Sequence, residues 1–189
     1  FLCVETPIKK SGKTNLTYLK NALKSVLSAV KLNKTKNKKL IVIKSTVPPS
    51  TTEKIVIPFI EKKGFTAGKD IFVANNPEFL RQANAWSDFI NQDRIIIGAT
   101  DNYSKKLLKK VYKPFKKPVC FVTPATSEFT KYLSNSFLAM LLSYSNEMSL
   151  IANSINGIDI ASAFKLFHKD KRWFGSPAAM CSYVYPNAG

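Results

Sequence analysis

Acidic residues are scarce in this chain of 189 residues. Asp and Glu number 12 against 29 Lys and Arg, which gives a formal net charge of +17 at pH 7. Such an excess of positive charge suggests polyanionic partners, such as nucleic acid, an anionic membrane or phosphorylated metabolites. The alternative is that lysine simply fills the surface, because the lysines are spread over many segments.

Cysteine is also rare. The three cysteines, Cys3, Cys120 and Cys181, form no CxxC pair and no regular spacing, so neither a zinc site nor a disulfide framework is expected. Cys3 and Cys120 lie in apolar, strand-like runs, where we expect small core residues. We recognise no signal peptide and no apolar run long enough to cross a bilayer, and therefore expect a cytoplasmic protein without a membrane partner.

Both ends of the sequence fall inside expected elements. The chain opens with a strand-like segment that no Met precedes, and its last residues, YPNAG, resemble the start of a loop. We therefore expect this chain to be the middle part of a longer protein.

Five short apolar runs predict strands. Their apolar character is continuous rather than alternating, which is typical of strands covered on both faces in a parallel sheet. Helical patterns separate several of the runs, and this order predicts a βαβ architecture with right-handed crossovers. The runs are FLCVET, KLIVIKS, DIFVANN, DRIIIGA and PVCFVT.

The first helical pattern follows Thr14 and Asn15, either of which is a plausible N-cap. Its apolar positions recur at spacings of 3 and 4, as expected for one buried helix face. They are Leu16, Leu19, Leu23, Leu27 and Val30.

Two further segments predict helices between strands. Residues 50–64 offer a cap at Ser50 or Thr51 and a stop at Gly64, with Pro58 predicting a kink or an early end. Residues 102–115 are amphipathic and are expected to stop near Pro114.

After Thr123 the pattern becomes purely helical. Residues 128–167 contain no Pro and no strand signal, and Gly157 is the expected break. One long apolar seam runs along them at spacings of 3 and 4. We therefore predict an α/β domain over 1–125 and the start of a helical domain over 126–189. The seam consists of Phe137, Leu141, Tyr144, Met148, Ile151 and Ile155.

Hydroxyl groups follow the first two expected strands, in VETP (4–7) and KSTVPPSTT (44–52). In an open parallel sheet, ligands bind outside the carboxyl ends of the strands, where helix N-termini favour phosphate. The hydroxyls of Thr6, Ser45 and Thr46 would suit a nucleotide there. Ordinary turn and capping chemistry is the alternative explanation.

A carboxylate follows the third expected strand, in NPEFL. Glu78 would lie at the same edge of the sheet, against Phe79 and Leu80. A carboxylate that is partly removed from water holds a proton more readily and can serve as a general base. Alternatively, Glu78 caps a turn or pairs with Arg81 or Arg94.

The stretch SEFTKYLSNSFLAM supplies Glu128, Lys131 and Asn135. Lys131 and Asn135 are four residues apart and therefore share a helix face. An ammonium and a carboxamide together are suitable donors for an oxygen that develops negative charge. The alternative is an ordinary surface lysine with Glu128 nearby as a helix-favouring residue.

Taken in order, these stretches resemble the nucleotide-sugar 6-dehydrogenases. The match runs through T-P after a strand, S-T-V-P-P, N-P-E-F-L, D-R-I-I-I-G and E-x-x-K-Y-x-x-N-x-F-L-A, and covers residues 1 to about 175. The resemblance implies part of a Rossmann-like doubly wound parallel sheet, followed by a mostly helical central domain that dimerises. It also implies oxidation of a sugar C6 alcohol to the acid with two NAD⁺, through a cysteine thiohemiacetal and thioester. Within the family it favours UDP-glucose as substrate.

Catalytic roles follow from the resemblance residue by residue. Glu78 would activate the water that hydrolyses the thioester, Lys131 and Asn135 would stabilise the oxyanion, and Thr6 would help to position the water. These polar ends should then converge on one cleft, well away from the lysines of residues 31–39. The residues expected along NAD are Thr6, Ser45, Thr46 and Glu78.

The resemblance also implies a sugar site that two subunits share. DKR at 170–172 matches the family's D-x-R, so Arg172 would reach the neighbouring subunit's substrate in a homodimer built on the central helix. The other residues expected along the UDP-sugar are Glu78, Phe79, Leu80, Lys131 and Asn135.

Several features depart from the family pattern. Ser50 replaces the usual Gly of S-T-V-P-P-G, and Gln82 stands where Glu is common. Cys181 lies in an unusually long link after Arg172 without the G-G-x-C pattern, so the nucleophile is expected beyond Gly189. The glycine-rich G-x-G-x-x-G half and the UDP-binding domain also lie outside this sequence, and we expect the chain alone to be inactive.

Three other interpretations compete with this one. GDP-mannose 6-dehydrogenases share NPEFL and the style of VIPFIEKKGFTAGKD, whereas QDRIIIG favours UDP-glucose and NPEFL disfavours a UDP-N-acetylmannosamine enzyme. A basic nucleic-acid-binding module would need exposed aromatics beside clustered Lys and Arg. Here the aromatics fall on predicted core faces, so no nucleic-acid partner is expected. The third interpretation is an enzyme remnant kept for assembly.

Overall fold

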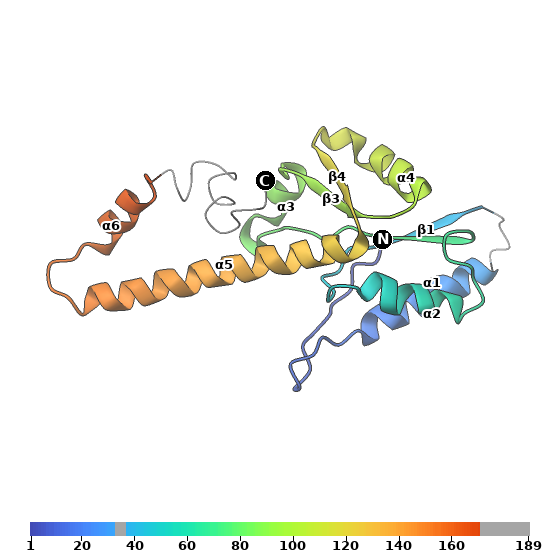
Figure 1. Ribbon diagram of the computed structural model, residues 1–189, viewed down its shortest axis with the longest axis horizontal. Coiled ribbons are helices and arrows are strands. Elements are labelled where there is room, and N and C mark those ends of the chain that lie inside the picture. Colours follow the sequence, from blue (N-terminus) through green and yellow to red (C-terminus); the bar gives the residue numbers. More distant parts are fainter. Residues whose placement is uncertain (33–36, 171–189) are drawn as a thin grey trace, which may run out of the picture. The chain divides into compact units, whose positions relative to one another are not determined.

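The computed structural model describes residues 1–32 and 37–170, so Arg172 and Cys181 lie outside the described residues. The chain divides into two compact units, 1–136 and 137–189. The first unit holds a sheet with helices on both faces, and the second is helical (Figure 1). The elements are α1 (Thr17–Leu32), β1 (Lys39–Ile43), η1 (Thr52–Val56), α2 (Ile57–Glu61), β2 (Ile71–Asn75), η2 (Gln82–Asn84), α3 (Ala85–Ile90), β3 (Ile95–Gly98), α4 (Asn102–Tyr112), η3 (Lys113–Phe115), β4 (Val119–Val122), α5 (Pro124–Asn153) and α6 (Ile160–Phe167).

The sheet has the strand order β1-β2-β3-β4. β1 pairs with β2 in parallel, and β3 with β4, but β2 and β3 meet in antiparallel fashion through a single pair, Asn75 opposite Gly98. The predicted fold class is confirmed, whereas the expectation of parallel pairing is wrong at this junction. A parallel neighbour needs a crossover of about a dozen or more residues, usually with a helix that runs the length of the strands. The 19 residues between β2 and β3 are numerous enough, but their α-helix, α3, has only 6 residues and spans about 9 Å.

Apolar side chains of the strands alternate between two cores. Ile41, Ile43 and Ile71 face the leucines of α1 and Ile60 of α2. On the opposite face, a second cluster joins the strands to α4. Figure 1 shows α1 and α2 on one side of β1 and α4 on the other side of the sheet. Both faces of β1, β2 and β3 are thus covered, as their continuous apolar runs predict. The second cluster comprises Val42, Ala74, Ile95, Ile97, Ala99, Leu108 and Tyr112.

Three of the predicted helices follow their sequence signals. In α1, Leu19, Leu23 and Leu27 are buried, and the Asn15 side chain accepts a hydrogen bond from the Thr17 N–H at 3.0 Å. α4 ends at Tyr112 and passes into a short 3-10 turn at Pro114. α5 runs for 30 residues, and Gly157, with φ of 84°, lies in the turn before α6.

The helix predicted over 50–64 begins differently from expectation. It starts at Thr52 in π geometry and changes to α geometry at Ile57, directly before Pro58. Neither Ser50 nor Thr51 caps it, because the Thr51 hydroxyl donates instead to the Pro48 carbonyl at 2.6 Å. The predicted cap is therefore wrong, and a carboxylate from α5 replaces it, as described below.

The first apolar run does not form the predicted strand. Leu2 makes one parallel bridge to Ile43, with its N–H donating to the Val42 carbonyl at 2.7 Å. Beyond Leu2, the Ser45 hydroxyl forms the hydrogen bonds that a neighbouring strand would otherwise provide. It accepts from the Val4 N–H at 2.8 Å and donates to the Val4 carbonyl at 2.6 Å. A side chain thus satisfies the backbone that a strand partner would have paired.

Cys3 and Cys120 are free thiols and both are exposed, so the prediction that they are core residues is wrong. Cys120 lies on β4, an edge strand of the sheet, whose side chains are only partly covered. Cys3 follows the single bridge of Leu2 and turns toward a pocket instead of the core. Apolar neighbours in sequence predicted burial, but neither segment has elements packed on both sides.

The apolar seam of α5 is largely exposed in the second unit. Phe137, Leu141, Tyr144 and Ile151 all present more than a third of their surface to solvent. Within the described parts of the chain, no helix has the length and apolar character needed to cross a membrane.

Candidate functional site

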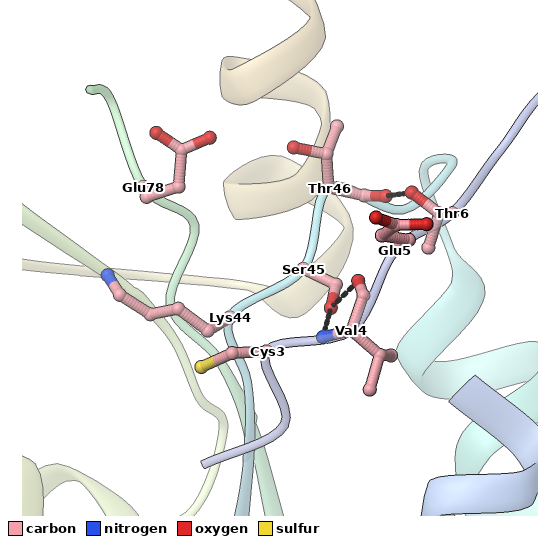
Figure 2. Close-up of a pocket in the computed structure, with 8 residues that line it drawn as sticks. All are labelled: Cys3, Val4, Glu5, Thr6, Lys44, Ser45, Thr46 and Glu78. Atoms are coloured by element: carbon pink, nitrogen blue, oxygen red, sulfur yellow. Dashed lines mark hydrogen bonds between the residues drawn. The ribbon is translucent and has the colours of Figure 1, made fainter. Parts of the chain in front are cut away.

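A pocket of about 290 Å³ lies at the carboxyl end of β1 (Figure 2). Because Ile43 pairs with Asn75 in the parallel ladder, the residues that follow β1 and β2 are neighbours at the same edge of the sheet. The pocket therefore gathers side chains from three separate segments. They are Cys3, Val4, Glu5, Thr6, Lys44, Ser45, Thr46 and Glu78.

The predicted hydroxyl residues all line this pocket. The Thr6 hydroxyl donates to the Thr46 carbonyl at 2.7 Å, and the Ser45 hydroxyl is occupied by the Val4 backbone. Figure 2 shows these bonds holding the two loops side by side. Thr6 and Ser45 thus fix the shape of the pocket wall in addition to lining it.

Glu78 and Lys131 form an ion pair, with Glu78 Oε1 2.9 Å from Lys131 Nζ. The Lys131 side chain is 5% exposed and that of Glu78 33% exposed. Lys131 is therefore no ordinary surface lysine. The second carboxylate oxygen, Oε2, accepts from the Leu80 N–H at 2.6 Å, so Glu78 also closes the turn that follows it.

The alternative arginine partners of Glu78 are engaged elsewhere. Arg81 pairs with Asp88 at 2.7 Å. Arg94 lies over the ring of Phe79, 5.1 Å from its centroid, and Lys131 lies 5.4 Å from the same centroid. Phe79 thus packs beneath two cations next to the carboxylate, whereas Leu80 is exposed.

Asn135 lies one turn after Lys131 on α5 and is exposed to solvent. It is not among the residues that line the pocket. The structure therefore brings Thr6, Ser45, Thr46 and Glu78 together and joins Lys131 to Glu78, while the inward contact expected for Asn135 stays a prediction.

Glu128 fixes the start of α5 against the loop that follows β1. Its carboxylate is 1% exposed. It accepts from the N–H groups of Thr51 and Thr52 at 3.1 and 2.8 Å, and from the Thr52 hydroxyl at 2.5 Å. Burial raises the pKa of Glu128 above its ordinary value, and these hydrogen bonds oppose the shift. The residue acts as a helix cap supplied from a distant element.

A close backbone approach brings the same turn of α5 to the sheet. A Cβ at Gly98 would lie 2.7 Å from both the Pro124 Cα and the Ser127 Cβ, so only glycine fits there. The Ser127 hydroxyl donates to the buried Asn75 side chain at 2.7 Å. Lys131 follows one turn later, which explains why its ammonium group reaches Glu78.

Lys44 is a site residue that sequence reasoning missed. Its Nζ donates to Asn76 Oδ1 at 3.2 Å and to the Pro77 carbonyl at 3.4 Å, and its side chain lines the pocket. The available signal was a lysine placed directly between a buried strand and the Ser-Thr pair. Among so many lysines, this position alone did not distinguish it.

Polar groups at the carboxyl edge of a doubly wound α/β sheet, beside a helix N-terminus, define the nucleotide-binding class of α/β domains. Comparison with known families agrees with this class. Residues 1–116 match the NAD binding domain of the UDP-glucose/GDP-mannose dehydrogenase family, and residues 125–189 match its central domain. The chain belongs to the UDP-glucose/GDP-mannose dehydrogenase family.

Two relatives illustrate the range of the family. The UDP-glucose 6-dehydrogenase of Rickettsia bellii is 40% identical over 91% of this chain and 38% of the relative. The GDP-mannose 6-dehydrogenase of Pseudomonas aeruginosa is 34% identical over 84% of this chain and 36% of the relative. The chain thus spans less than half the length of either relative.

Solved structures show the same fold. A GDP-mannose dehydrogenase from Pseudomonas aeruginosa superposes with a TM-score of 0.84 at 31% identity, covering 93% of this chain and 41% of the other. A UDP-glucose dehydrogenase from Pyrobaculum islandicum superposes with a TM-score of 0.79 at 38% identity, covering 88% and 38%.

The pocket suits part of a nicotinamide dinucleotide. Its volume of about 290 Å³ lies just below the ~300–1,000 Å³ usual for ligand pockets. It would accept one ring with its polar substituent and not a whole dinucleotide. Its walls offer the hydroxyl groups of Thr6, Ser45 and Thr46, which match the uncharged amide and sugar groups of such a ligand. The charged side chains of Glu5, Lys44 and Glu78 line the same pocket.

Proposed function

We propose that the protein of which this chain is part oxidises the C6 alcohol of UDP-glucose to the carboxylate of UDP-glucuronate. Each sugar would reduce two NAD⁺ in two successive steps. Family membership and the 40% identity to a UDP-glucose 6-dehydrogenase support this substrate. GDP-mannose is the second candidate, because a GDP-mannose 6-dehydrogenase is 34% identical.

The observation that carries the proposal is the Glu78–Lys131 ion pair beside a hydroxyl-lined pocket. An ionised carboxylate has about four acceptor positions. Lys131 and the Leu80 N–H occupy two of those of Glu78. Room therefore remains for a water molecule, from which Glu78 would take the proton during thioester hydrolysis.

Lys131 would stabilise the negative charge that forms on the sugar oxygen. An ammonium group that is mostly removed from water interacts strongly with such a charge. Asn135 would add a carboxamide donor from the next turn of α5, and Thr6 would help to position the water. A cysteine would carry the sugar as thiohemiacetal and then as thioester.

NAD would supply the hydride acceptor when bound. Thr6, Ser45 and Thr46 would hold its nicotinamide end through the loops that they join, and Glu78 would lie next to it. Phe79 and Leu80 would contact the UDP-sugar, because they follow Glu78 on the same turn.

We further propose that the protein is a homodimer built on the apolar seam of residues 137–155, most of which lies on α5. The exposed apolar side chains of this seam support the proposal, since such surfaces commonly mark protein interfaces. Arg172 would then complete the substrate site of the neighbouring subunit.

The test uses the full-length protein, with NADH formation followed for UDP-glucose and GDP-mannose side by side. UDP-glucose should give two NADH per sugar consumed. Faster turnover of GDP-mannose would make GDP-mannose the proposed substrate in place of UDP-glucose. If neither sugar gives NADH, the proposed function is refuted. Lys62→Met, at an exposed position after α2, is the matched control for Lys131→Met, which alone should lose activity.

A further inference from the structure

Lys44 and Asn76 are lateral neighbours by the register of the sheet. Each is the first residue after its strand, and the last residues of those strands, Ile43 and Asn75, pair with each other. Asn76 is 1% exposed. Figure 2 shows the Lys44 side chain reaching the same side of the pocket as Glu78.

The Asn76 carboxamide has one orientation only. Its Nδ2 donates to the Ile96 carbonyl at 2.8 Å, so its Oδ1 is the acceptor for both Lys44 and the Tyr112 hydroxyl. Burial raises the pKa of Tyr112 to about 12. The phenol therefore keeps its proton at working pH and stays a donor, so Asn76 presents a fixed acceptor to Lys44.

The second contact of Lys44 falls on the peptide that precedes Glu78. Its Nζ lies 3.4 Å from the Pro77 carbonyl. Pro77 has no N–H, so the ladder of β2 cannot continue through this residue. Lys44 therefore holds the backbone before Glu78, while Lys131 holds the carboxylate itself.

We propose that Lys44 is a positioning residue of this site, whose ammonium group holds the Asn76 side chain and the Pro77 carbonyl so that the Glu78 carboxylate faces both the pocket and Lys131. The inference rests on the proposed function. Because a charged donor binds a carbonyl or amide oxygen more strongly than a neutral one, the positive charge of Lys44 is part of this role.

Charged and titratable groups from several elements lie around Lys44. They are Cys3 and Glu5 on the first segment, Glu78 after β2, Lys131 on α5 and, through Asn76, Tyr112 on α4. Burial lowers the pKa of Lys44 to about 8; Glu78 and Cys3 oppose this shift, and Lys131 adds to it. The ammonium form therefore prevails below about pH 8.

Activity and stability should consequently respond to pH in opposite directions. Above about pH 8, Lys44 loses the charge that holds the loop, so activity should fall. Between about pH 8 and 10.5, the unfolded chain binds a proton that the folded chain has released, so the Lys44 contribution to stability should rise. Deprotonation of Lys44 should therefore lower activity without itself lowering the free energy of unfolding.

The test compares full-length wild type with Lys44→Met, Lys44→Arg and the exposed control Lys62→Met. The quantities are kcat and KM for UDP-glucose with saturating NAD⁺, measured across neutral and alkaline pH. Lys44→Met should lower kcat about 10- to 100-fold, with a smaller change in KM, and should abolish the alkaline limb near pH 8. Lys44→Arg should recover most of kcat and move the limb upward, because guanidinium stays charged. Lys62→Met should change none of these.

An unchanged kcat and pH profile in Lys44→Met would overturn the inference while leaving the proposed function intact. Wild type that is inactive with both sugars would instead refute the proposed function. In that case unfolding free energies test whether Lys44 is buried at this site. Between about pH 8 and 10.5, the unfolding free energy of wild type should rise relative to that of Lys44→Met. A difference that stays constant with pH would refute the burial of Lys44. If Lys44→Met does not fold, the shift of the limb in Lys44→Arg decides the question.

Discussion

Two contacts orient the Glu78 carboxylate and still leave acceptor positions free for a water molecule. Lys131 holds one oxygen and the Leu80 N–H holds the other, yet a third of the side chain is exposed. The carboxylate is thus oriented without being enclosed. A general base needs this combination, since its direction must be set before water arrives and its free acceptor positions must face the water.

Replacing Glu78 by Gln should remove the base while preserving the shape of the side chain. We expect kcat of the full-length enzyme to fall about 10²- to 10⁴-fold, the usual contribution of a general base. Steady-state NADH formation with UDP-glucose measures the change. Glu61→Gln is the matched control, because it makes the same change at an exposed position, at the end of α2. Equal losses in both variants would contradict the assignment.

Ser50 carries backbone strain. Its φ of 68° lies in the left-handed region, where a side chain costs roughly 1–2 kcal/mol. The resemblance predicts Gly at this position, and the structure supplies the physical reason for that preference. Ser50 joins the loop lining the pocket to the N-terminus of the following helix, so the strain is stored next to the site.

Ser50→Gly should relieve this strain. We expect the free energy of unfolding to rise by about 0.5–1 kcal/mol, since glycine also loses more backbone entropy on folding. Urea unfolding gives the value. Ser50→Ala retains the Cβ and should give no gain, so a gain in Ala equal to that in Gly would show that φ is not the cause.

Among the elements, α5 depends on one buried carboxylate for its position. Glu128 accepts three hydrogen bonds from Thr51 and Thr52 at the start of the helix that follows β1. The cap therefore ties the first turn of α5 to the pocket loop, and Lys131 lies three residues beyond the cap. The Glu78–Lys131 ion pair therefore depends on the contact of Glu128 with Thr51 and Thr52.

The pH dependence of Glu128 can be predicted in sign. Burial raises its pKa above the ordinary 4.5, so the folded chain holds this proton after the unfolded chain has released it. The stability from this group is therefore present below about pH 4.5 and is lost as pH rises through the folded pKa. Glu128→Gln releases no proton. The unfolding free energy of Glu128→Gln, measured in urea from acidic to neutral pH, should rise relative to that of wild type as pH rises. A difference between the two proteins that stays constant with pH would contradict the prediction.

The contact between β3 and α5 leaves no room for a side chain at Gly98. A Cβ there would meet Pro124 and Ser127 at 2.7 Å. Gly98→Ala should push α5 away and lower the free energy of unfolding by about 1–3 kcal/mol, as overpacking usually does. The kcat of Gly98→Ala should fall as well, because Lys131 lies on α5 and moves with it. Gly64→Ala is the comparison, since nothing lies within 4 Å of the added carbon and its cost comes from φ of 86° alone.

For the whole molecule, the proposed homodimer with a shared substrate site predicts complementation between subunits. A heterodimer of Arg172→Ala and Lys131→Ala subunits should regain activity that neither homodimer has, because one of its two sites contains both native residues. About half of the wild-type activity per dimer is the upper limit. Differently tagged subunits isolate the heterodimer, and its inactivity would count against a site completed by Arg172 of the neighbouring subunit.

Sequence patterns predicted the elements well wherever local spacing decides the structure. The leucines of α1, the buried runs of β1, β2 and β3, and the break near Gly157 follow from periodicity and chain stiffness. The encounter of Glu78 with Lys131 could be expected only from the resemblance, because 53 residues separate them. The roles assigned to both residues stay predictions.

Partners distant in sequence explain the misses. The first run appeared strand-like from its composition, but Ser45 replaces the ladder beyond Leu2. Cys120 lies in an apolar run, yet its strand is at an edge of the sheet. Lys44 is one lysine among many until Asn76 is placed beside it. In each case the deciding contact comes from another element, which no local pattern contains.

The single residue pair between β2 and β3 has a mechanical consequence. In a full ladder, sliding one strand along the next breaks a row of hydrogen bonds together. Here one rung, Asn75 opposite Gly98, and one side-chain amide, Asn76 to the Ile96 carbonyl, join the two halves of the sheet. A shear between the halves therefore meets little backbone resistance along this line. The Asn76 side chain also binds Lys44 in the pocket wall. The weakly paired junction of β2 and β3 therefore lies directly beside the place where the ligand is expected.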